Sequence, residues 1–241
     1  NVWDAMTARI VARTPGVRAL ATASHSVAYA LGVEDGEGMS VDMALAAAGR
    51  ITAATDLPVS VDFERGYAAD AAGVRANVAR LIEAGAAGLN IEDSLAGATS
   101  ERRPIADAAA RVAAARAAAD EAGVPLAINA RTDTLAGSPE NWSEAIDRAN
   151  AYVDAGATSV FMLGLRTEQL VADAVAAVRA PIAVFAHPGY LPLSRLAELG
   201  VGRVSFGPQI LGLTLAHLAD AAALLTARGE YPAELSYRYE L

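Results

Sequence analysis

The sequence predicts an α/β fold, a (β/α)8 TIM barrel. Helical stretches repeatedly run into a glycine and are followed by a short apolar strand, and three of these strands end on acidic or basic residues. Glycine suits the left-handed residue that ends a helix, and a continuous apolar strand suits a parallel sheet that is buried on both faces. The length of 241 residues fits one barrel, so residues 1–241 are expected to form a single catalytic domain.

Seven strands are predicted in chain order, and four of them follow helices that stop at Gly85, Gly123, Gly156 and Gly200. Their expected ranges are 19–23, 59–64, 88–93, 126–131, 159–163, 181–185 and 203–206. Residues 1–4 resemble the tip of an eighth strand whose body lies upstream. We therefore expect the first strand of the barrel to be truncated in this sequence.

Composition indicates a compact soluble enzyme rather than a tail or a fibre. Apolar residues make up 54% of the chain, the formal net charge is −9 and the isoelectric point is near 4.8. An acidic chain lacks the basic face that phosphate binding needs, so no nucleic-acid partner is expected. The apolar stretch 174–186 is broken by Arg179 and Pro181 short of a bilayer span. No membrane association and a cytoplasmic location are predicted.

Two residue types are absent, and their absence removes whole mechanisms. The chain has no cysteine, and all 19 basic residues are arginine. A Schiff-base lysine, a thiol nucleophile and a thiolate metal site are therefore excluded. The chemistry must use carboxylates, arginine, histidine, hydroxyl groups, backbone amides and a metal ion.

The charged strand ends predict a metal and oxyacid site. The carboxyl ends of parallel barrel strands meet at one mouth, so Asp62, Glu92 and Arg131 are expected to share a pocket. An unpaired carboxylate at the end of a buried strand is costly, which favours function for both acids. Two nearby acids can instead serve the structure alone, because Asp35 lies in a glycine-rich turn and Glu64 can pair with Arg65. The structural alternative for Arg131 is that it neutralises the acids and has no other role.

Five motifs, in this order along the chain, carry a family resemblance. They are Asn-Val-Trp-Asp-Ala at 1–5, Gly-Val-Glu-Asp-Gly at 32–36, Asp-Phe-Glu-Arg-Gly-Tyr at 62–67, Asn-Ile-Glu-Asp at 90–93 and Asn-Ala-Arg-Thr-Asp at 129–133. The chain resembles the isocitrate lyase / phosphoenolpyruvate mutase superfamily, in its methylisocitrate lyase-like branch. The resemblance implies a Mg²⁺ enzyme, with Mn²⁺ as a substitute, that acts on a keto or hydroxy acid. It also implies a homodimer or homotetramer whose subunits meet through C-terminal helices.

The resemblance also implies roles for individual residues. Asp62 would bind the metal directly, Glu64 and Glu92 directly or through water, and Asp35 through water. Arg131 would pair with a substrate carboxylate. The backbone N–H groups of Ala23, Ser24 and His25, at the end of the first predicted strand, would bind the oxyanion. The Asn129 amide completes the substrate-binding set.

The remaining candidates have structural alternatives. His187, just after the strand at 181–185, is predicted to be catalytic, and Tyr67 is predicted to shape the pocket or act in catalysis, its alternative being a loop aromatic. His25 is expected beside the oxyanion amides, and His217, on a predicted helix, is expected to serve in packing or to lie at the surface. Asp133 can orient Arg131 or cap the next helix, and we favour the cap.

The chain departs from the superfamily in residues 94–104. Lyases of the superfamily carry a Lys-Cys-Gly-His type segment there, with the cysteine as general acid, whereas this chain carries Ser-Leu-Ala-Gly-Ala-Thr-Ser-Glu-Arg-Arg-Pro. Such a segment can still act as a lid, with Arg102 and Arg103 available for a carboxylate. The acid must be replaced by His187, His25, Tyr67 or water, unless the reaction needs none.

Three functions are compatible with these residues. The first is a lyase that cuts a carbon–carbon bond of a 2-hydroxy tricarboxylate of the 2-methylisocitrate or isocitrate type and releases a keto acid. The second is an oxaloacetate decarboxylase, or a hydrolase of an oxoacid or phosphonopyruvate. The third is a keto-acid-binding barrel with little turnover. We favour the lyase.

Overall fold

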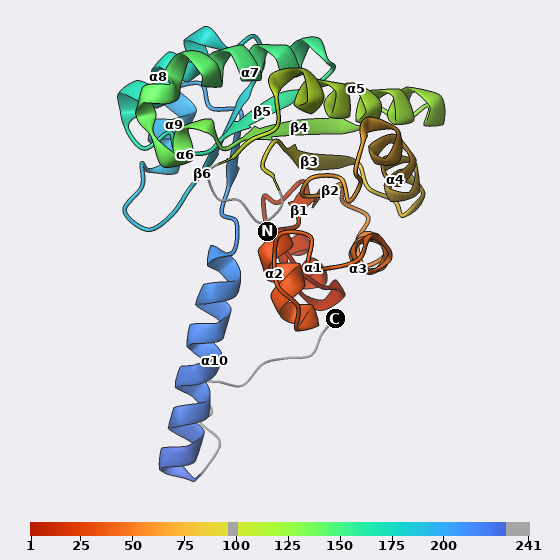
Figure 1. Cartoon of the computed structure of the whole chain (residues 1–241). Helices are drawn as coiled ribbons and strands as arrows, with labels where there is room; N and C mark the ends of the chain where they lie inside the picture. Colours follow the sequence, from red (N-terminus) through yellow and green to blue (C-terminus); the bar gives the residue numbers. More distant parts are fainter. Residues whose placement is uncertain (96–100, 230–241) are drawn as a thin grey trace.

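The structure is a computed structural model that describes residues 1–95 and 101–229. Its centre is a curled parallel sheet of seven strands in sequential order, with helices between them (Figure 1). The strands are β1 (Leu20–Ala21), β2 (Val59–Asp62), β3 (Gly88–Glu92), β4 (Ala127–Thr132), β5 (Ser159–Met162), β6 (Ile182–Phe185) and β7 (Arg203–Ser205). All seven predicted strands are present within one or two residues, which confirms the barrel-type α/β fold.

The register of the central strands sets which side chains meet at the mouth. Asn90 of β3 lies opposite Asn129 of β4, and Glu92 lies opposite Arg131. Side chains two residues apart on a strand point to the same face. The two amides therefore form one layer inside the curled sheet, and the charged pair forms the next layer toward the mouth.

Residues 1 and 2 lie between the two ends of the sheet. Val2 forms a parallel bridge with Thr22, directly after β1. The Asn1 side chain donates to the Thr22 carbonyl at 2.9 Å and accepts the Phe206 N–H, after β7, at 3.1 Å. The N-terminal residues thus take the place predicted for the tip of another strand. A largely apolar cleft of about 580 Å³ lies beside Asn1 along β1, β2 and β7.

The helices cover the outside of the sheet, and glycines end several of them as predicted. Gly85, Gly123, Gly156 and Gly200 all have positive φ, between 66° and 103°. The helices are α1 (Ala5–Ala12), α2 (Ser24–Leu31), α3 (Val41–Thr52), α4 (Ala71–Glu83), α5 (Ile105–Ala122), α6 (Thr134–Gly137), the 3₁₀ turn η1 (Pro139–Asn141), α7 (Trp142–Asp154), α8 (Glu168–Ala177), α9 (Leu193–Glu198) and α10 (Gln209–Arg228).

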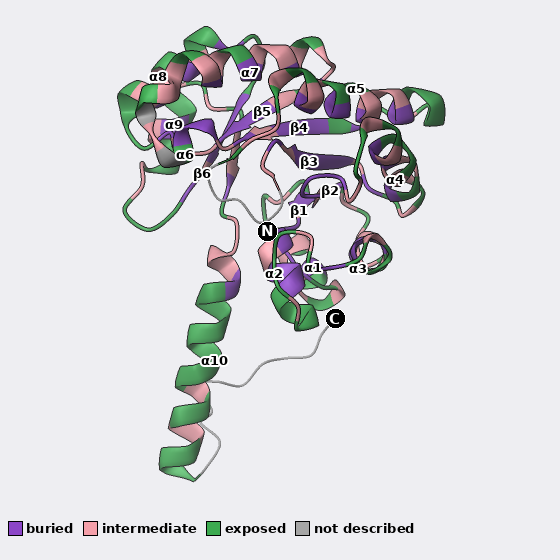
Figure 2. Ribbon diagram, in the orientation of Figure 1, coloured by how far each residue is buried: buried purple, intermediate pink, exposed green. Residues whose placement is uncertain are grey.

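The hydrophobic core lies between the strands and the helices that flank them. The strands are largely buried in Figure 2, and Leu89, Ile128 and Val160 have no exposed surface. Many core positions on the helices are alanine, for example Ala115 and Ala119 of α5. Small side chains let the helices lie close to the sheet, which holds the strand ends in fixed positions.

Helix α10 differs from the others because it extends away from the barrel (Figures 1 and 2). Leu211 at its start is buried, whereas Leu213, Leu215 and Leu218 are 50–63% exposed. Among the described residues, α10 is the one helix long and apolar enough to cross a membrane by length and composition, and 6% of its apolar window is buried. The sequence predicted a helix around His217, but the membrane prediction rested on the apolar stretch 174–186 and did not consider this helix.

Two predicted features lie wholly or partly outside the described residues. They are the centre of the lid segment, residues 96–100, and the C-terminal segment 230–241.

Candidate active site

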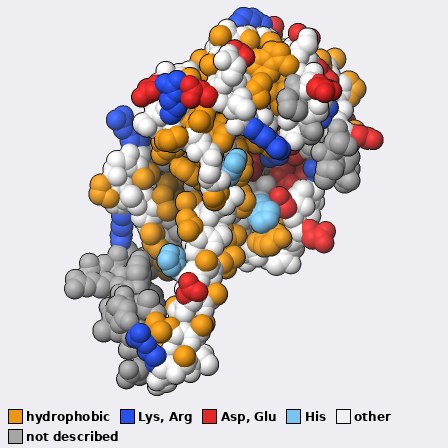
Figure 3. Space-filling view, turned by 90° about the vertical axis from the view of Figure 1, so that its left-hand side faces the viewer, with side chains coloured by type: hydrophobic (Ala, Val, Ile, Leu, Met, Phe, Trp, Pro, Cys, Tyr) orange, Lys and Arg blue, Asp and Glu red, His pale blue; other side chains and the backbone are white. Residues whose placement is uncertain are grey.

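A cavity of about 220 Å³ opens at the carboxyl ends of the strands. Seen from the side in Figure 3, acidic side chains lie in a recess with arginine and histidine side chains close by. Six of the predicted site residues line this cavity: Ala23, Ser24, His25, Asp35, Asp62 and Arg131. The other lining residues are Asn1, Thr22, Asn90, Phe161, Leu163, Phe185, Ser205, Gly207 and Pro208.

Asp62, the last residue of β2, is held by the segment that joins β1 to α2. Its backbone N–H donates to the Thr22 hydroxyl at 2.8 Å, and its carboxylate accepts the Ser24 N–H at 3.0 Å. Ser24 is the first residue of α2, where backbone N–H groups lack partners within the helix. One of the predicted oxyanion donors therefore binds Asp62 in this structure.

Arg131 lies between two carboxylates. Its Nη1 is 2.9 Å from a Glu92 oxygen, as expected from the pairing of these residues across β3 and β4. Its Nε and Nη2 each donate to Asp133 at 2.7 Å, which is a bidentate pair. Our preference for Asp133 as a helix cap was wrong: its side chain makes no capping hydrogen bond to α6 and orients Arg131 instead.

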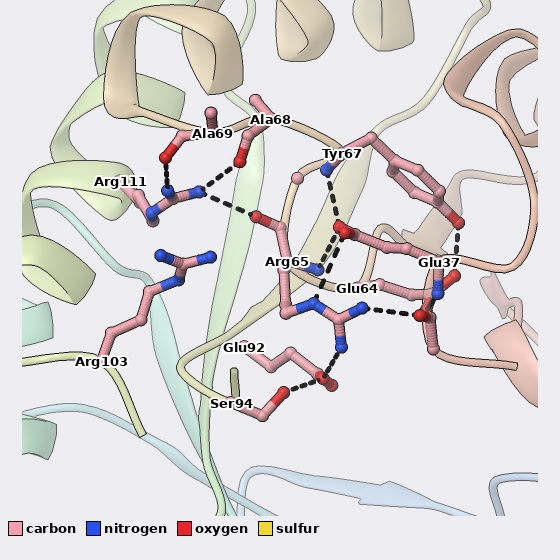
Figure 4. Close-up of polar contacts among 12 residues, drawn as sticks. Glu37, Glu64, Arg65, Tyr67, Ala68, Ala69, Glu92, Ser94, Arg103 and Arg111 are labelled. Atoms are coloured by element: carbon pink, nitrogen blue, oxygen red, sulfur yellow. Dashed lines mark hydrogen bonds and ion pairs between the residues drawn. The ribbon is translucent and has the colours of Figure 1, made fainter. Parts of the chain in front are cut away.

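Glu64 and Tyr67 face each other rather than the cavity. The Tyr67 hydroxyl and the Glu37 N–H both donate to the Glu64 carboxylate (Figure 4). Arg65, in contrast, pairs with Glu37 at 3.4 Å and lies 3.8 Å from Glu92. The alternative that Glu64 pairs with Arg65 is therefore not what the structure has.

The electrostatic environment raises the pKa of both glutamates. Burial raises the pKa of Glu64 to about 7, with Asp62 and Asp35 adding to the shift and the donors Tyr67 and Glu37 opposing it. Burial also raises the pKa of Glu92, against the pull of Arg131. For Arg131, burial opposes the charge, but Glu92 and Asp133 outweigh it and the net effect raises the pKa of the guanidinium.

The oxygen donors suit a hard divalent cation that keeps much of its water. Asp62 and Asp35 line the same cavity together with the Asn90 amide. No three acidic or histidine side chains within residues 1–95 and 101–229 converge as a closed metal cage. Mg²⁺ needs few protein ligands because it retains several waters. The residues therefore fit a sparsely held Mg²⁺-type ion, whereas they do not fit a cage of protein ligands.

The remaining predicted residues lie around the cavity rather than on it. His187 and Tyr190 line an adjoining cavity of about 430 Å³, which shares Leu163 and Phe185 with the first. Asn129 lies in the layer of Asn90, one layer below Arg131; its amide donates to Asn90 at 2.7 Å and its oxygen accepts from Ser159 at 2.6 Å.

Two site residues were missed, although the sequence contains a signal for one. Asn90 precedes Glu92 by two residues on the same strand, so alternation alone places both on the inner face. Glu37 gave no such signal, since its role depends on a contact between two loops that are far apart in sequence. In the structure it accepts the N–H groups of Arg65 and Tyr67 at 3.2 and 2.8 Å.

A parallel barrel with carboxylates and an arginine at its carboxyl end defines a class of enzymes that bind small oxyacids. Comparison with known proteins shows which family of such enzymes the chain belongs to. Residues 1–226 match the phosphoenolpyruvate phosphomutase family. The chain is 35% identical to 2-methylisocitrate lyase of Escherichia coli over 81% of this chain and 68% of that protein. It is 34% identical to oxaloacetate decarboxylase of Rhodopseudomonas palustris over 77% and 67%.

A solved structure supports the same superfamily. A phosphonomutase-type protein of Burkholderia cenocepacia is 44% identical, with a TM-score of 0.89 and 92% of each chain covered. The chain belongs to the phosphoenolpyruvate mutase / isocitrate lyase superfamily, as its motifs predicted. Two of the relatives named above, 2-methylisocitrate lyase and oxaloacetate decarboxylase, are lyases, and members of the superfamily are generally metal-dependent.

The contact between Asp133 and Arg131 leads to a first prediction. Asp133→Asn removes a bidentate charged partner, so Arg131 should lose its fixed orientation and KM for the substrate should rise about tenfold or more, given the ~1.5–3 kcal/mol typical of charged hydrogen bonds. Steady-state kinetics measures this. Asp154→Asn, which breaks the exposed pair with Arg179, is the matched control. Equal KM values for the two variants would contradict the orienting role.

Proposed function

We propose that this chain is a Mg²⁺-dependent carbon–carbon lyase that cleaves a 2-hydroxy acid of the 2-methylisocitrate or isocitrate type and releases a keto acid. The observation that carries the proposal is the meeting of Asp62, Asp35 and Arg131 in one cavity. The E. coli relative, 2-methylisocitrate lyase, supports the substrate type. We further propose that residues 1–241 act as one catalytic domain in the cytoplasm, with Mn²⁺ able to replace Mg²⁺.

The site residues divide the work of such a cleavage. What a divalent cation supplies in such a site is polarisation of a substrate oxygen and stabilisation of developing negative charge. Asp62 and Asp35 would hold the ion, Glu64 and Glu92 would act on it through water, and Arg131 would bind a substrate carboxylate. Asp133 uses two of the five guanidinium N–H groups, which leaves Nη1 and the outer hydrogen of Nη2 for substrate and Glu92.

The proton donor is the step for which this chain needs its own solution. In the cleavage the 2-hydroxyl group becomes the keto group and gives its proton to a base, while the electron pair of the broken bond stays on the departing fragment as an enolate-like species, which must be protonated. The chain has no cysteine for this task. His25 lines the cavity, and its Nδ1 is buried without a hydrogen-bond partner. We therefore assign proton donation to His25. His187 is less well placed because it lines the adjoining cavity, and Tyr67 because its hydroxyl donates to Glu64.

Oxaloacetate decarboxylation is the second candidate. It needs stabilisation of an enolate but no thiol, and the R. palustris relative carries that name. A keto-acid-binding barrel with little turnover is the third, and it would bind oxoacids in a Mg²⁺-dependent way without releasing product.

Product formation distinguishes the three candidates. Incubation with 2-methylisocitrate and Mg²⁺ is expected to release pyruvate and succinate in equal amounts, and EDTA or Asp62→Ala should abolish both. A coupled assay for pyruvate and chromatography for succinate measure the reaction. Pyruvate and CO₂ from oxaloacetate alone would favour the decarboxylase. Metal-dependent binding of oxoacids without any product would favour the binding protein.

The assignment of His25 makes its own prediction. His25→Gln should lower kcat by about 10²- to 10⁴-fold, the usual contribution of a general acid, with little change in KM. His187→Gln should lower kcat less than about tenfold, because His187 lines the adjoining cavity. A larger loss for His187→Gln than for His25→Gln would reverse the assignment.

We also propose that the chain forms a homodimer or homotetramer, with neither a membrane nor a nucleic acid as partner, and that α10 makes the subunit contact. Exposed leucines, among them Leu213 and Leu218, leave apolar surface of this helix uncovered. Removing such surface from water contributes about 25 cal/mol per Å² buried.

The subunit contact is tested by charge. The double variant Leu213→Asp and Leu218→Asp should convert the oligomer to a monomer in sedimentation velocity, whereas Leu193→Asp on α9, at a residue 55% exposed, should not. Flotation with phosphatidylcholine vesicles tests the alternative: co-flotation of the wild-type protein, lost in the double variant, would show that α10 binds membrane instead.

A further inference from the structure

The loop after β2 is held in a conformation that its residues do not favour. Glu64 and Tyr67 have φ of 46° and 53°, in the left-handed region that side chains rarely adopt. Gly66 has φ of 89°, and a Cβ at this position would lie 2.9 Å from Val74. Such a loop persists only where its surroundings hold it in place. The question is which groups do so.

Arg111 holds this loop from the side of α5. Its side chain is 1% exposed, and its guanidinium donates to three backbone carbonyls of the loop (Figure 4). The acceptors are Arg65 at 3.3 Å, Ala68 at 3.1 Å and Ala69 at 2.5 Å. Its carboxylate partner within the described residues is Asp107, at 3.4 Å on the same helix. A planar fork with five donors can satisfy several carbonyls at once, which an ammonium group cannot do in the same geometry.

Glu37 holds the same loop from the opposite side. Its carboxylate accepts the N–H groups of Arg65 and Tyr67, and the Arg65 guanidinium donates back to the Gly36 carbonyl at 2.6 Å. The segment that carries Asp35 is thereby joined to the loop that carries Glu64. Displacement of one loop would therefore displace the other.

We propose that Arg111 is a positioning residue for the metal site: by fixing the carbonyls of residues 65–69, it holds Glu64, Arg65 and, through Glu37, Asp35 in their places around Asp62. Arg111 does not touch the cavity. The inference rests on the proposed function insofar as it concerns the metal, but the clamping of the loop can be measured separately.

Arg116 provides a matched control on the same helix. It is partly buried and donates to the carbonyls of Leu126 at 2.5 Å and Gly156 at 3.4 Å. Both acceptors precede strands, at the end of the barrel opposite the mouth, so loss of Arg116 removes contacts of the same kind away from the site. A purely structural role for Arg111 predicts the same consequences for both substitutions.

The experiment compares the full-length wild type with Arg111→Met, Arg111→Lys, Glu37→Ala and Arg116→Met. Isothermal titration calorimetry with Mg²⁺ measures metal affinity, and hydrogen–deuterium exchange measures protection of the amides of residues 64–69. Loss of groups that orient metal ligands typically costs 10- to 100-fold in affinity. We expect a loss of this size for Arg111→Met and Glu37→Ala, a smaller loss for Arg111→Lys, and less than a twofold change for Arg116→Met.

Each outcome decides the proposal. Faster exchange in residues 64–69 with weakened Mg²⁺ binding, in the Arg111 and Glu37 variants only, supports it. Wild-type affinity and exchange in Arg111→Lys and Glu37→Ala would overturn it, even if Arg111→Met fails to fold. Equal losses of affinity in Arg116→Met would also overturn it, since the effect would then be general destabilisation. If the wild type binds no Mg²⁺, the proposed function fails, and the exchange data alone decide whether Arg111 clamps the loop.

Discussion

The arrangement of the mouth depends on the carboxylate of Glu92. It is mostly removed from water at the end of β3, where an isolated charge would be costly, and it lies between Arg131 at 2.9 Å and Arg65 at 3.8 Å. Arg131 belongs to β4 and Arg65 to the loop after β2, so one carboxylate joins three consecutive strand ends. Asp133 then fixes the other edge of the Arg131 guanidinium. The positions of these four charged groups, Glu92, Arg131, Arg65 and Asp133, are therefore each set by at least one other.

The same charges explain why the mouth favours a cation. Carboxylates outnumber the guanidinium groups around it: Asp35, Glu37, Asp62, Glu64, Glu92 and Asp133 lie near Arg65 and Arg131. Repulsion from Asp62 adds to burial in raising the pKa of both Glu64 and Glu92. A bound divalent ion would relieve this repulsion, whereas an anionic substrate that bound without the metal would increase it. The geometry therefore couples metal binding to the binding of an anionic substrate.

Much of this mouth follows from the sequence because strand periodicity is local. The strand ranges and the meeting of Glu92 and Arg131 at one mouth follow from apolar runs that end on charges and from the topology of a parallel barrel. The role of Asp133 could not be obtained in this way, since a residue after a strand can serve either a helix or a side chain. The roles of Glu37 and Arg111 could not be predicted from the sequence either, because both residues contact backbone groups of a loop whose path is defined only in the folded chain.

The absence of lysine gives these contacts a common chemical basis. Arg111, Arg116 and Arg148 each donate to backbone carbonyls of other segments, at distances down to 2.5 Å. A guanidinium remains protonated at any pH at which the protein is folded, so these groups hold geometry and take no part in proton transfer. With cysteine and lysine both absent, proton transfer in the mouth falls to the imidazole, the tyrosine, the carboxylates and water. His25 is the histidine among them that lines the site cavity, with a ring nitrogen that makes no hydrogen bond within the described chain. Replacing the missing thiol by this imidazole would require no rearrangement of the charged strand ends, because His25 enters from α2 while the carboxylates and Arg131 are positioned by β2, β3 and β4.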